Sequence, residues 1–96
     1  MRENKRHIKF TKGARSSFTS LSKGEQSKTI QFLEVLSEDF QSTSLSTRIY
    51  KLSGTEKPLY ALRLNQKLRI ILELSDEKIL VLDILNHDLF IKYFKN

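Results

Sequence analysis

The chain contains no cysteine among its 96 residues. It can therefore hold no disulfide framework, no thiolate nucleophile and no thiolate metal site, and this usage fits a reducing cytosol. No apolar run is long enough to span a bilayer, and the first residues, MRENKRHIKF, are too polar for a signal peptide. We therefore expect a soluble, cytoplasmic protein without a membrane segment, a metal or another cofactor.

The length of the chain sets the number of domains. At 96 residues it is long enough to bury one hydrophobic core without covalent or metal staples, and too short for two. We expect a single domain over residues 1–96.

Positive charge is in excess. The chain has 17 Lys and Arg against 11 Asp and Glu, a formal net charge of +6 and a pI near 9.7. Within the first 23 residues the only acid is Glu3, whereas the bases are Arg2, Lys5, Arg6, Lys9, Lys12, Arg15 and Lys23. This excess favours a polyanion or an acidic protein as the partner, although a basic surface can also serve solubility alone.

The first half of the chain predicts a strand and two helices. Polar and apolar residues alternate over Arg6–Thr11, as in a strand, and helical spacing of apolar residues follows from about Lys12 to Leu21. Ser22 and Glu25 have the spacing of a capping box, so a second helix should begin there. Its apolar stripe is Ile30, Leu33, Leu36 and Phe40, widened by Phe32 and Val35. The two helices should form a hairpin.

The second half predicts a meander of strands. After a polar connector at Gln41–Thr47, Arg48–Leu52 can form a short extended segment. Three strands should follow, at about Leu59–Leu64, Leu68–Leu74 and Ile79–Leu85. The C-terminal residues should form a short helix capped by Asn86 or Asp88, which returns Leu89, Phe90 and Phe94 to the core. The fold class is α+β.

Two arginines stand inside the apolar strands. A three-residue turn at Asn65–Lys67 would pair Leu64 with Leu68 and keep one leucine-rich face, which places Arg63 directly opposite Arg69. Like charges across a ladder repel, so a sheet selected only for stability would avoid the pair. We therefore expect removal of Arg69 to leave stability unchanged or raised, because the arginines serve binding.

An acid could also neutralise the two arginines. Asp83 and Glu73 are candidates, but the face of Asp83 depends on the next turn. A two-residue turn (Asp76, Glu77) sends Asp83 to the core face, and a three-residue turn brings it beside Arg69. If helices cover only the leucine face, the arginine face is an open surface suited to phosphates, which the guanidinium fork binds in bidentate fashion.

Such a surface can promote transesterification of RNA without a metal. The 2′ hydroxyl attacks the adjacent phosphate, a base and an acid move protons, and cations stabilise the charged phosphorane. Arg63 and Arg69 supply the cations, and His87 beyond the last strand is a candidate acid or base that Asp88 could orient. His87 can also be an ordinary surface group at a helix start.

Three further residues are candidates for contacting the substrate. Lys51 could flank the groove, Lys67 could grip phosphate from its loop, and Tyr93 could donate a proton or stack on a base. Each also has an ordinary interpretation, a solvated lysine or a core aromatic residue. His7, within the first strand, is not expected to take part.

The segments KLSG, PLYALRL, LRIILEL and VLDILNHD, in this order after a strand and a helix hairpin, resemble the RelE/ParE superfamily of bacterial type II toxins. The resemblance covers most of the chain. It implies a compact α+β toxin without a cofactor, which a cognate antitoxin wraps and neutralises. The RelE-like members are endoribonucleases that cleave mRNA, in many cases on the ribosome, and so arrest translation.

The resemblance also assigns residues. Arg69 matches the arginine that RelE-like enzymes use on the scissile phosphate, Arg63 a basic position of the preceding strand, and His87 the histidine or arginine after the last strand. The sequence departs at Ala61 and Asp88, where basic residues are frequent in the family. These departures keep two alternatives open, a gyrase-poisoning toxin of the ParE branch and a non-catalytic binding module of the same fold.

Overall fold

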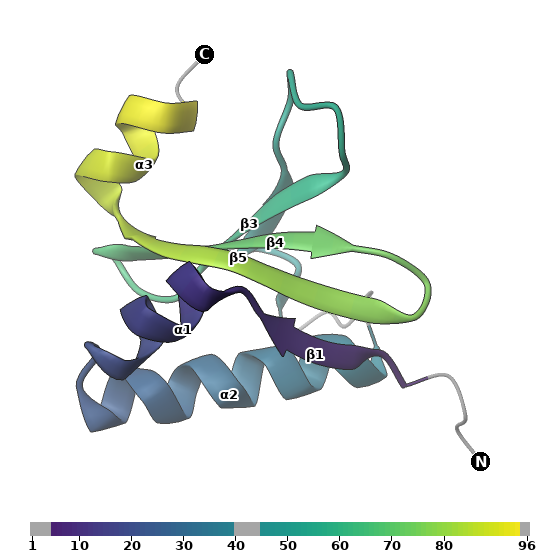
Figure 1. Ribbon diagram of the computed structural model, residues 1–96, viewed down its shortest axis with the longest axis horizontal. Coiled ribbons are helices and arrows are strands. Elements are labelled where there is room, and N and C mark those ends of the chain that lie inside the picture. The colour runs from purple at the N-terminus through teal and green to yellow at the C-terminus, as the bar shows by residue number, and fades with distance from the viewer. Residues whose placement is uncertain (1–4, 40–44, 95–96) are drawn as a thin grey trace.

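Within the described residues, 5–39 and 45–94 of the computed structural model, five strands form one sheet between layers of helix (Figure 1). The strand order is β1-β5-β4-β3-β2. The elements are β1 (His7–Phe10), α1 (Lys12–Thr19), α2 (Lys23–Glu38), β2 (Ile49–Lys51), β3 (Leu59–Arg63), β4 (Leu68–Leu74), β5 (Lys78–Asn86) and α3 (His87–Phe94). The predicted α+β class and element order are confirmed.

The helices α1 and α2 lie along one face of the sheet (Figure 1). The Thr11 hydroxyl accepts a hydrogen bond from the Ala14 backbone N–H and caps α1. The predicted capping box of α2 is present: the Glu25 N–H donates to the Ser22 hydroxyl, and the Ser22 N–H donates to the Glu25 carboxylate. Of the predicted stripe, Leu33 and Leu36 are fully buried. Ile30 is instead 39% exposed.

The main core lies between these helices and the sheet. Because strand side chains alternate, every second residue of β3 and β4 points toward α1 and α2, and β5 contributes Ile79, Val81 and Ile84 to the same face. The buried members of this cluster are Ala14, Leu33, Leu36, Leu45, Leu62, Leu64, Ile70, Leu72, Ile79, Val81 and Ile84. This leucine-rich face is the one expected from the sequence.

The register of β3 and β4 is the predicted one. The Leu64 N–H donates to the Leu68 carbonyl at 3.0 Å, which closes a turn over Asn65–Lys67. Arg63 is consequently paired with Arg69 across the ladder. The turn length thus brings two cations onto one end of the sheet.

The next turn and a bulge together decide the position of Asp83. The Ser75 N–H donates to the Lys78 carbonyl, so the turn has two central residues. Ladder pairing then slips by one residue, because Asp83 pairs with Ile71 while Val81 pairs with Leu72. Leu85, and not Asp83, is the partner of Arg69. Both expected positions of Asp83 assumed a regular strand without a bulge. The bulge reverses which face of the sheet the following residues of β5 point to.

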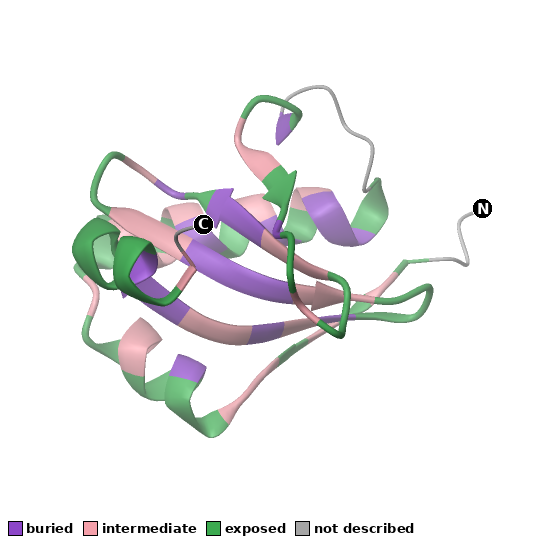
Figure 2. Cartoon of the chain, turned by 90° about the horizontal axis from the view of Figure 1, so that it is seen from above, coloured by how far each residue is buried: buried purple, intermediate pink, exposed green. Residues whose placement is uncertain are grey.

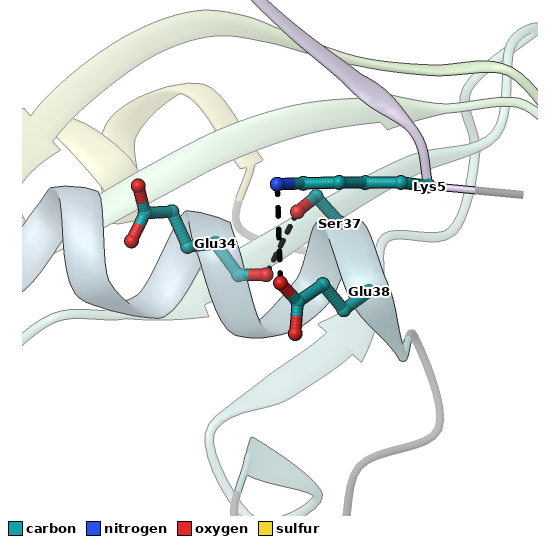
Figure 3. Close-up of polar contacts among 4 residues, drawn as sticks. All are labelled: Lys5, Glu34, Ser37 and Glu38. Carbon is teal, nitrogen blue, oxygen red and sulfur yellow. Dashed lines mark hydrogen bonds and ion pairs between the residues drawn. The ribbon is translucent and has the colours of Figure 1, made fainter. Parts of the chain in front are cut away.

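The strand β1 completes the sheet by pairing in parallel with β5, with Ile8 opposite Ile79. Its start is fixed to the end of α2, where the Arg6 N–H donates to the Ser37 carbonyl. Beside this contact the Lys5 ammonium lies 3.8 Å from the Glu38 carboxylate (Figure 3). The Ser37 hydroxyl donates to the Glu34 carbonyl within the helix.

The helix α3 packs on the opposite face of the sheet, over one end of it (Figures 1 and 2). Phe90 is 7% exposed and joins a second buried cluster with Leu52, Ala61, Ile71 and Leu85. The arginine face is therefore partly covered, so the condition under which it would be a fully open surface is met only in part. Leu89, expected in the core, is 39% exposed.

Some expectations fall outside the described residues. These are the positions of Arg2, of Phe40 and of most of the connector Gln41–Thr47. In the described part of the chain no helix combines the length and the apolar character that a membrane span requires.

Candidate nucleic-acid interface

A hollow of about 440 Å³ lies where the β3–β4 turn meets the start of α3. It is lined by Arg63, Gln66, Lys67, Arg69, Asn86, His87 and Asp88. Five of these seven residues were predicted as site residues from the sequence. The structure therefore brings together residues that lie up to 25 positions apart, since Arg63 and Asp88 both line the hollow.

The two arginines differ in how they are held. The Arg63 side chain is exposed. The Arg69 guanidinium is half-buried, and its Nη1 donates to the carbonyls of Asn65 at 2.9 Å and Leu68 at 3.1 Å, with a longer contact to Gln66 at 3.5 Å. Arg69 thus holds the turn as well as facing the hollow, and these hydrogen bonds argue against the prediction that its removal leaves stability unchanged or raised.

In the described structure no acidic side chain neutralises the two arginines. Among the described residues neither Arg63 nor Arg69 forms an ion pair, and the Asp83 carboxylate instead accepts a hydrogen bond from the Ser17 hydroxyl. Carbonyl dipoles at the turn partly stabilise the Arg69 charge. The Arg63 guanidinium is exposed and has no such partner in the described structure. The pair therefore leaves positive potential in the hollow, where an anion would be stabilised.

The turn that carries Lys67 is rigidly joined to α3. The Asn65 side-chain oxygen accepts hydrogen bonds from the backbone N–H groups of Lys67 and Leu68, at 2.8 and 2.9 Å. The Lys67 carbonyl then accepts from the His87 N–H at 2.7 Å. These hydrogen bonds place the turn that carries Lys67 beside His87.

His87 and Asp88 are the first two residues of α3. The Asn86 side-chain oxygen accepts from the Leu89 N–H at 2.8 Å, so Asn86 is the cap among the two predicted candidates. Both His87 and Asp88 are exposed, and both line the hollow. The N-terminal end of a helix adds a partial positive charge here, which Asp88 partly offsets.

Two predicted residues lie elsewhere. Lys51 is exposed and lines hollows formed by the β2–β3 loop and by α3, away from the arginines. Tyr93 is 64% exposed and lines an apolar hollow near the end of α3. The structure does not bring either of them to the arginine hollow.

Sequence reasoning missed Gln66, Asn86 and Arg48. Gln66 and Asn86 line the hollow, and only Asn86 carried a signal, as a possible helix cap. Arg48 Nη1 donates to the carbonyls of Arg63 and Leu64, at 3.1 and 3.4 Å, and its guanidinium stacks over the Phe32 ring at 5.1 Å. Arg48 therefore supports the strand end that presents Arg63, a contact that only the three-dimensional structure reveals.

The donor set fits an anion better than a metal ion. Within the described ranges no group of three or more His, Asp and Glu side chains is arranged to hold a metal. The hollow offers guanidinium, ammonium, amide and imidazole groups, which bind phosphate oxygens directly.

The fold belongs to a known class of small toxins. The chain has the fold of the RelE, YafQ and YoeB toxins of type II toxin–antitoxin systems, and this likeness covers most of its length. No protein-family model matches the sequence, and a comparison with curated proteins finds no match. The fold is thus recognised from structure and not from sequence similarity.

Three solved structures illustrate the likeness. The RelE–RelB complex of the archaeon Pyrococcus horikoshii matches with a TM-score of 0.69 and 23% identity, over 85% of this chain and 94% of the other. The DinJ–YafQ toxin–antitoxin complex of E. coli gives 0.72 and 14%, over 88% and 96%. The YoeB dimer of Staphylococcus aureus gives 0.69 and 18%, over 86% and 98%. At these identities the likeness establishes the fold alone.

Proposed function

We propose that this protein is the toxin of a type II toxin–antitoxin system and acts as a metal-independent endoribonuclease on mRNA. The observation that carries the proposal is the hollow of about 440 Å³, whose lining brings Arg63, Arg69 and Lys67 together with His87. The fold shared with RelE, YafQ and YoeB supports the toxin assignment. Cleavage of mRNA, in the cytoplasm and on the ribosome, would arrest translation.

The proposed chemistry uses the residues as follows. Arg63 and Arg69 hold the scissile phosphate and stabilise the charge that builds up when the 2′ hydroxyl attacks it. His87 in its neutral form takes the proton of the 2′ hydroxyl and, once charged, gives a proton to the leaving 5′ oxygen. Lys67 and Gln66 hold the neighbouring phosphate. Lys51 and Tyr93 remain candidates for contacts with RNA outside the hollow.

The direct test is cleavage of a labelled RNA by the purified protein in the presence of EDTA. We expect 2′,3′-cyclic phosphate ends and no cleavage of DNA of the same sequence, which lacks the 2′ hydroxyl. The assay is run with free RNA and with mRNA bound in ribosomes. The matched control is the double variant Arg63→Ala/Arg69→Ala. Intact RNA in both settings, and intact transcripts after induction in bacteria, would overturn the proposal.

One observation favours a second candidate, a gyrase poison with the same fold. Asp88 lines the hollow and reduces its positive charge, and Ala61 is fully buried beneath α3, where RelE-like enzymes often have a basic residue. Induction of DNA damage with intact mRNA would support this candidate. If induction of the protein caused no growth arrest, the result would point to a non-catalytic binding module.

A toxin of this kind needs a neutralising partner. The net charge of +6 favours an acidic antitoxin that associates through charge complementarity. Co-expression of small neighbouring reading frames should relieve growth arrest. If no neighbouring protein does so, the antitoxin part of the proposal fails.

A further inference from the structure

A second hollow, of about 290 Å³, lies on the α3 side of the sheet, at the opposite end of α3 from the arginines. Its lining is apolar except for one carboxylate and one phenol: Leu59, Ile71, Leu82, Leu85, Phe94, Tyr93 and Asp83. Of its lining, only Tyr93 is a candidate RNA contact, and none of these residues takes part in the proposed cleavage step. Its composition is also opposite to that of the arginine hollow, which is polar and cationic.

The bulge in β5 creates this lining. Leu82 is the extra residue of the bulge, since Val81 pairs with Leu72 and Asp83 pairs with Ile71. In an unbroken strand Asp83 would lie on the same face as Val81, within the leucine core. The bulge instead leaves both Leu82 and Asp83 half-buried at the hollow. Bulges re-aim side chains in this way and are frequent next to functional sites.

The Asp83 carboxylate has no cation. Its Oδ1 accepts hydrogen bonds from the Ser17 hydroxyl at 3.0 Å and from the Ile84 N–H at 2.8 Å. No residue in the described ranges forms an ion pair with it. The two hydrogen bonds satisfy Oδ1 but supply no opposite charge, so a cation placed beside this half-buried carboxylate would be stabilised. In a chain of net charge +6, the hollow is thus a local site for an incoming positive charge.

The size and the open wall indicate the kind of occupant. The volume is at the lower limit of pockets that bind small molecules. Tyr93, which forms one wall, is 64% exposed, so the hollow opens to the surface and can be entered by a side chain that remains attached to a chain. A nucleic acid is disfavoured because Asp83 would repel its phosphates and the lining offers no cation.

We infer that this hollow is a docking site for a segment of a partner protein that inserts an apolar side chain and places a lysine or arginine against Asp83. The helix α3 has eight residues, about 12 Å along its axis, and separates this site from the arginine hollow. A partner can therefore occupy the apolar hollow while RNA, or an acidic segment of the same partner, occupies the other.

The test uses two amphipathic helical peptides of about 14 residues, long enough for measurable helicity. Both carry leucine on one face, and one has lysine and the other glutamate at the flanking positions. Binding to the isotope-labelled protein is mapped by chemical-shift changes. We expect the lysine peptide to perturb Leu82, Asp83 and Tyr93, and the glutamate peptide to perturb Arg63, Lys67 and Arg69.

The substitution Asp83→Asn keeps the acceptor oxygen for Ser17 and removes the charge. It should weaken binding of the lysine peptide about three- to tenfold, the range for one partly exposed ion pair that becomes desolvated. The matched control is Asp76→Asn, which removes an exposed acid of the β4–β5 turn and should change nothing. Equal weakening by both variants would mean that only net charge matters, and would overturn the inference.

A second variant tests the apolar wall. Tyr93→Ala removes an exposed side chain, so the fold should persist while binding of the lysine peptide falls. If the lysine peptide caused its chemical-shift changes on other surfaces and not around Leu82 and Asp83, the inference would also be overturned. All these measurements are independent of RNA cleavage, so loss of the nuclease proposal would leave this result standing, and failure here would leave the nuclease proposal untouched.

Discussion

At the scale of single residues, Arg69 holds the β3–β4 turn and is also proposed to bind the scissile phosphate, whereas Arg63 has only the second, proposed role. Arg69→Ala should slow RNA cleavage about thirty-fold to a thousand-fold, as expected when one preorganised charge donor is lost. It should also lower the melting temperature, because the Arg69 hydrogen bonds to the carbonyls of Asn65, Gln66 and Leu68 are lost. Thermal melts and single-turnover cleavage rates on the same samples measure both effects.

Arg63→Ala is the matched control for this prediction. The Arg63 side chain is exposed and, in the described structure, makes no hydrogen bond, so its loss should slow cleavage with a change in stability within about 0.5 kcal/mol. If Arg69→Ala melted early and kept full toxicity, Arg69 would belong to the fold alone.

His87 gives a second prediction at this scale. His87→Asn should slow cleavage about a hundredfold to ten-thousandfold, the usual contribution of a general acid or base. Its side chain is exposed, so the melting temperature should not change. The control is His7→Asn, which replaces an exposed histidine on β1. This variant should cleave RNA at the normal rate. Equal rates for the two variants would remove His87 from the mechanism.

At the scale of elements, the capping box of α2 makes a prediction about stability. Ser22→Ala removes the acceptor of the Glu25 N–H and should cost about 1 kcal/mol of unfolding free energy. Cleavage by the folded protein should be unaffected, because α2 lies on the other face of the sheet from the arginines. Ser27→Ala, an exposed position within the same helix, is the control and should cost much less in denaturant titrations.

The elements also show what the sequence could predict. Capping residues, the three-residue turn and the leucine alternation are local signals, and they gave the helix starts and the register that pairs Arg63 with Arg69. The Leu82 bulge could not be predicted, because no Gly or Pro marks it. Its position depends on how β5 passes from pairing with β1 to contact with α1, where the Thr11 hydroxyl donates to the Leu82 carbonyl.

The candidate site was predictable in part for the same reason. Arg63, Lys67 and Arg69 lie close in sequence, so turn geometry alone brings them together. His87 joins them only through the long-range hydrogen bond to the Lys67 carbonyl, for which the resemblance to RelE-like toxins was the guide. Lys51 and Tyr93 were misplaced relative to the hollow because side-chain periodicity does not fix where a strand end or a helix lies over the sheet.

At the scale of the whole molecule, charge predicts how RNA binding depends on salt. If Arg63, Lys67 and Arg69 each neutralise one phosphate, the logarithm of the binding constant should fall with the logarithm of salt concentration with a slope of about −2 for single-stranded RNA. Fluorescence anisotropy with a non-cleavable 2′-deoxy analogue measures this slope. The Lys67→Ala variant should reduce it by about 0.7, and an unchanged slope would place the phosphates elsewhere.

The parallel pairing of β1 with β5 has a consequence for synthesis. Thr11 and Leu82, which meet at the end of this pairing, are 71 positions apart, so the sheet cannot close until nearly all the described chain has left the ribosome. Closing so long a loop is entropically costly and slow. Nascent chains stalled before β5 emerges should therefore be degraded by protease. The hollow that Arg69 and His87 line therefore cannot form while β5 is still being synthesised.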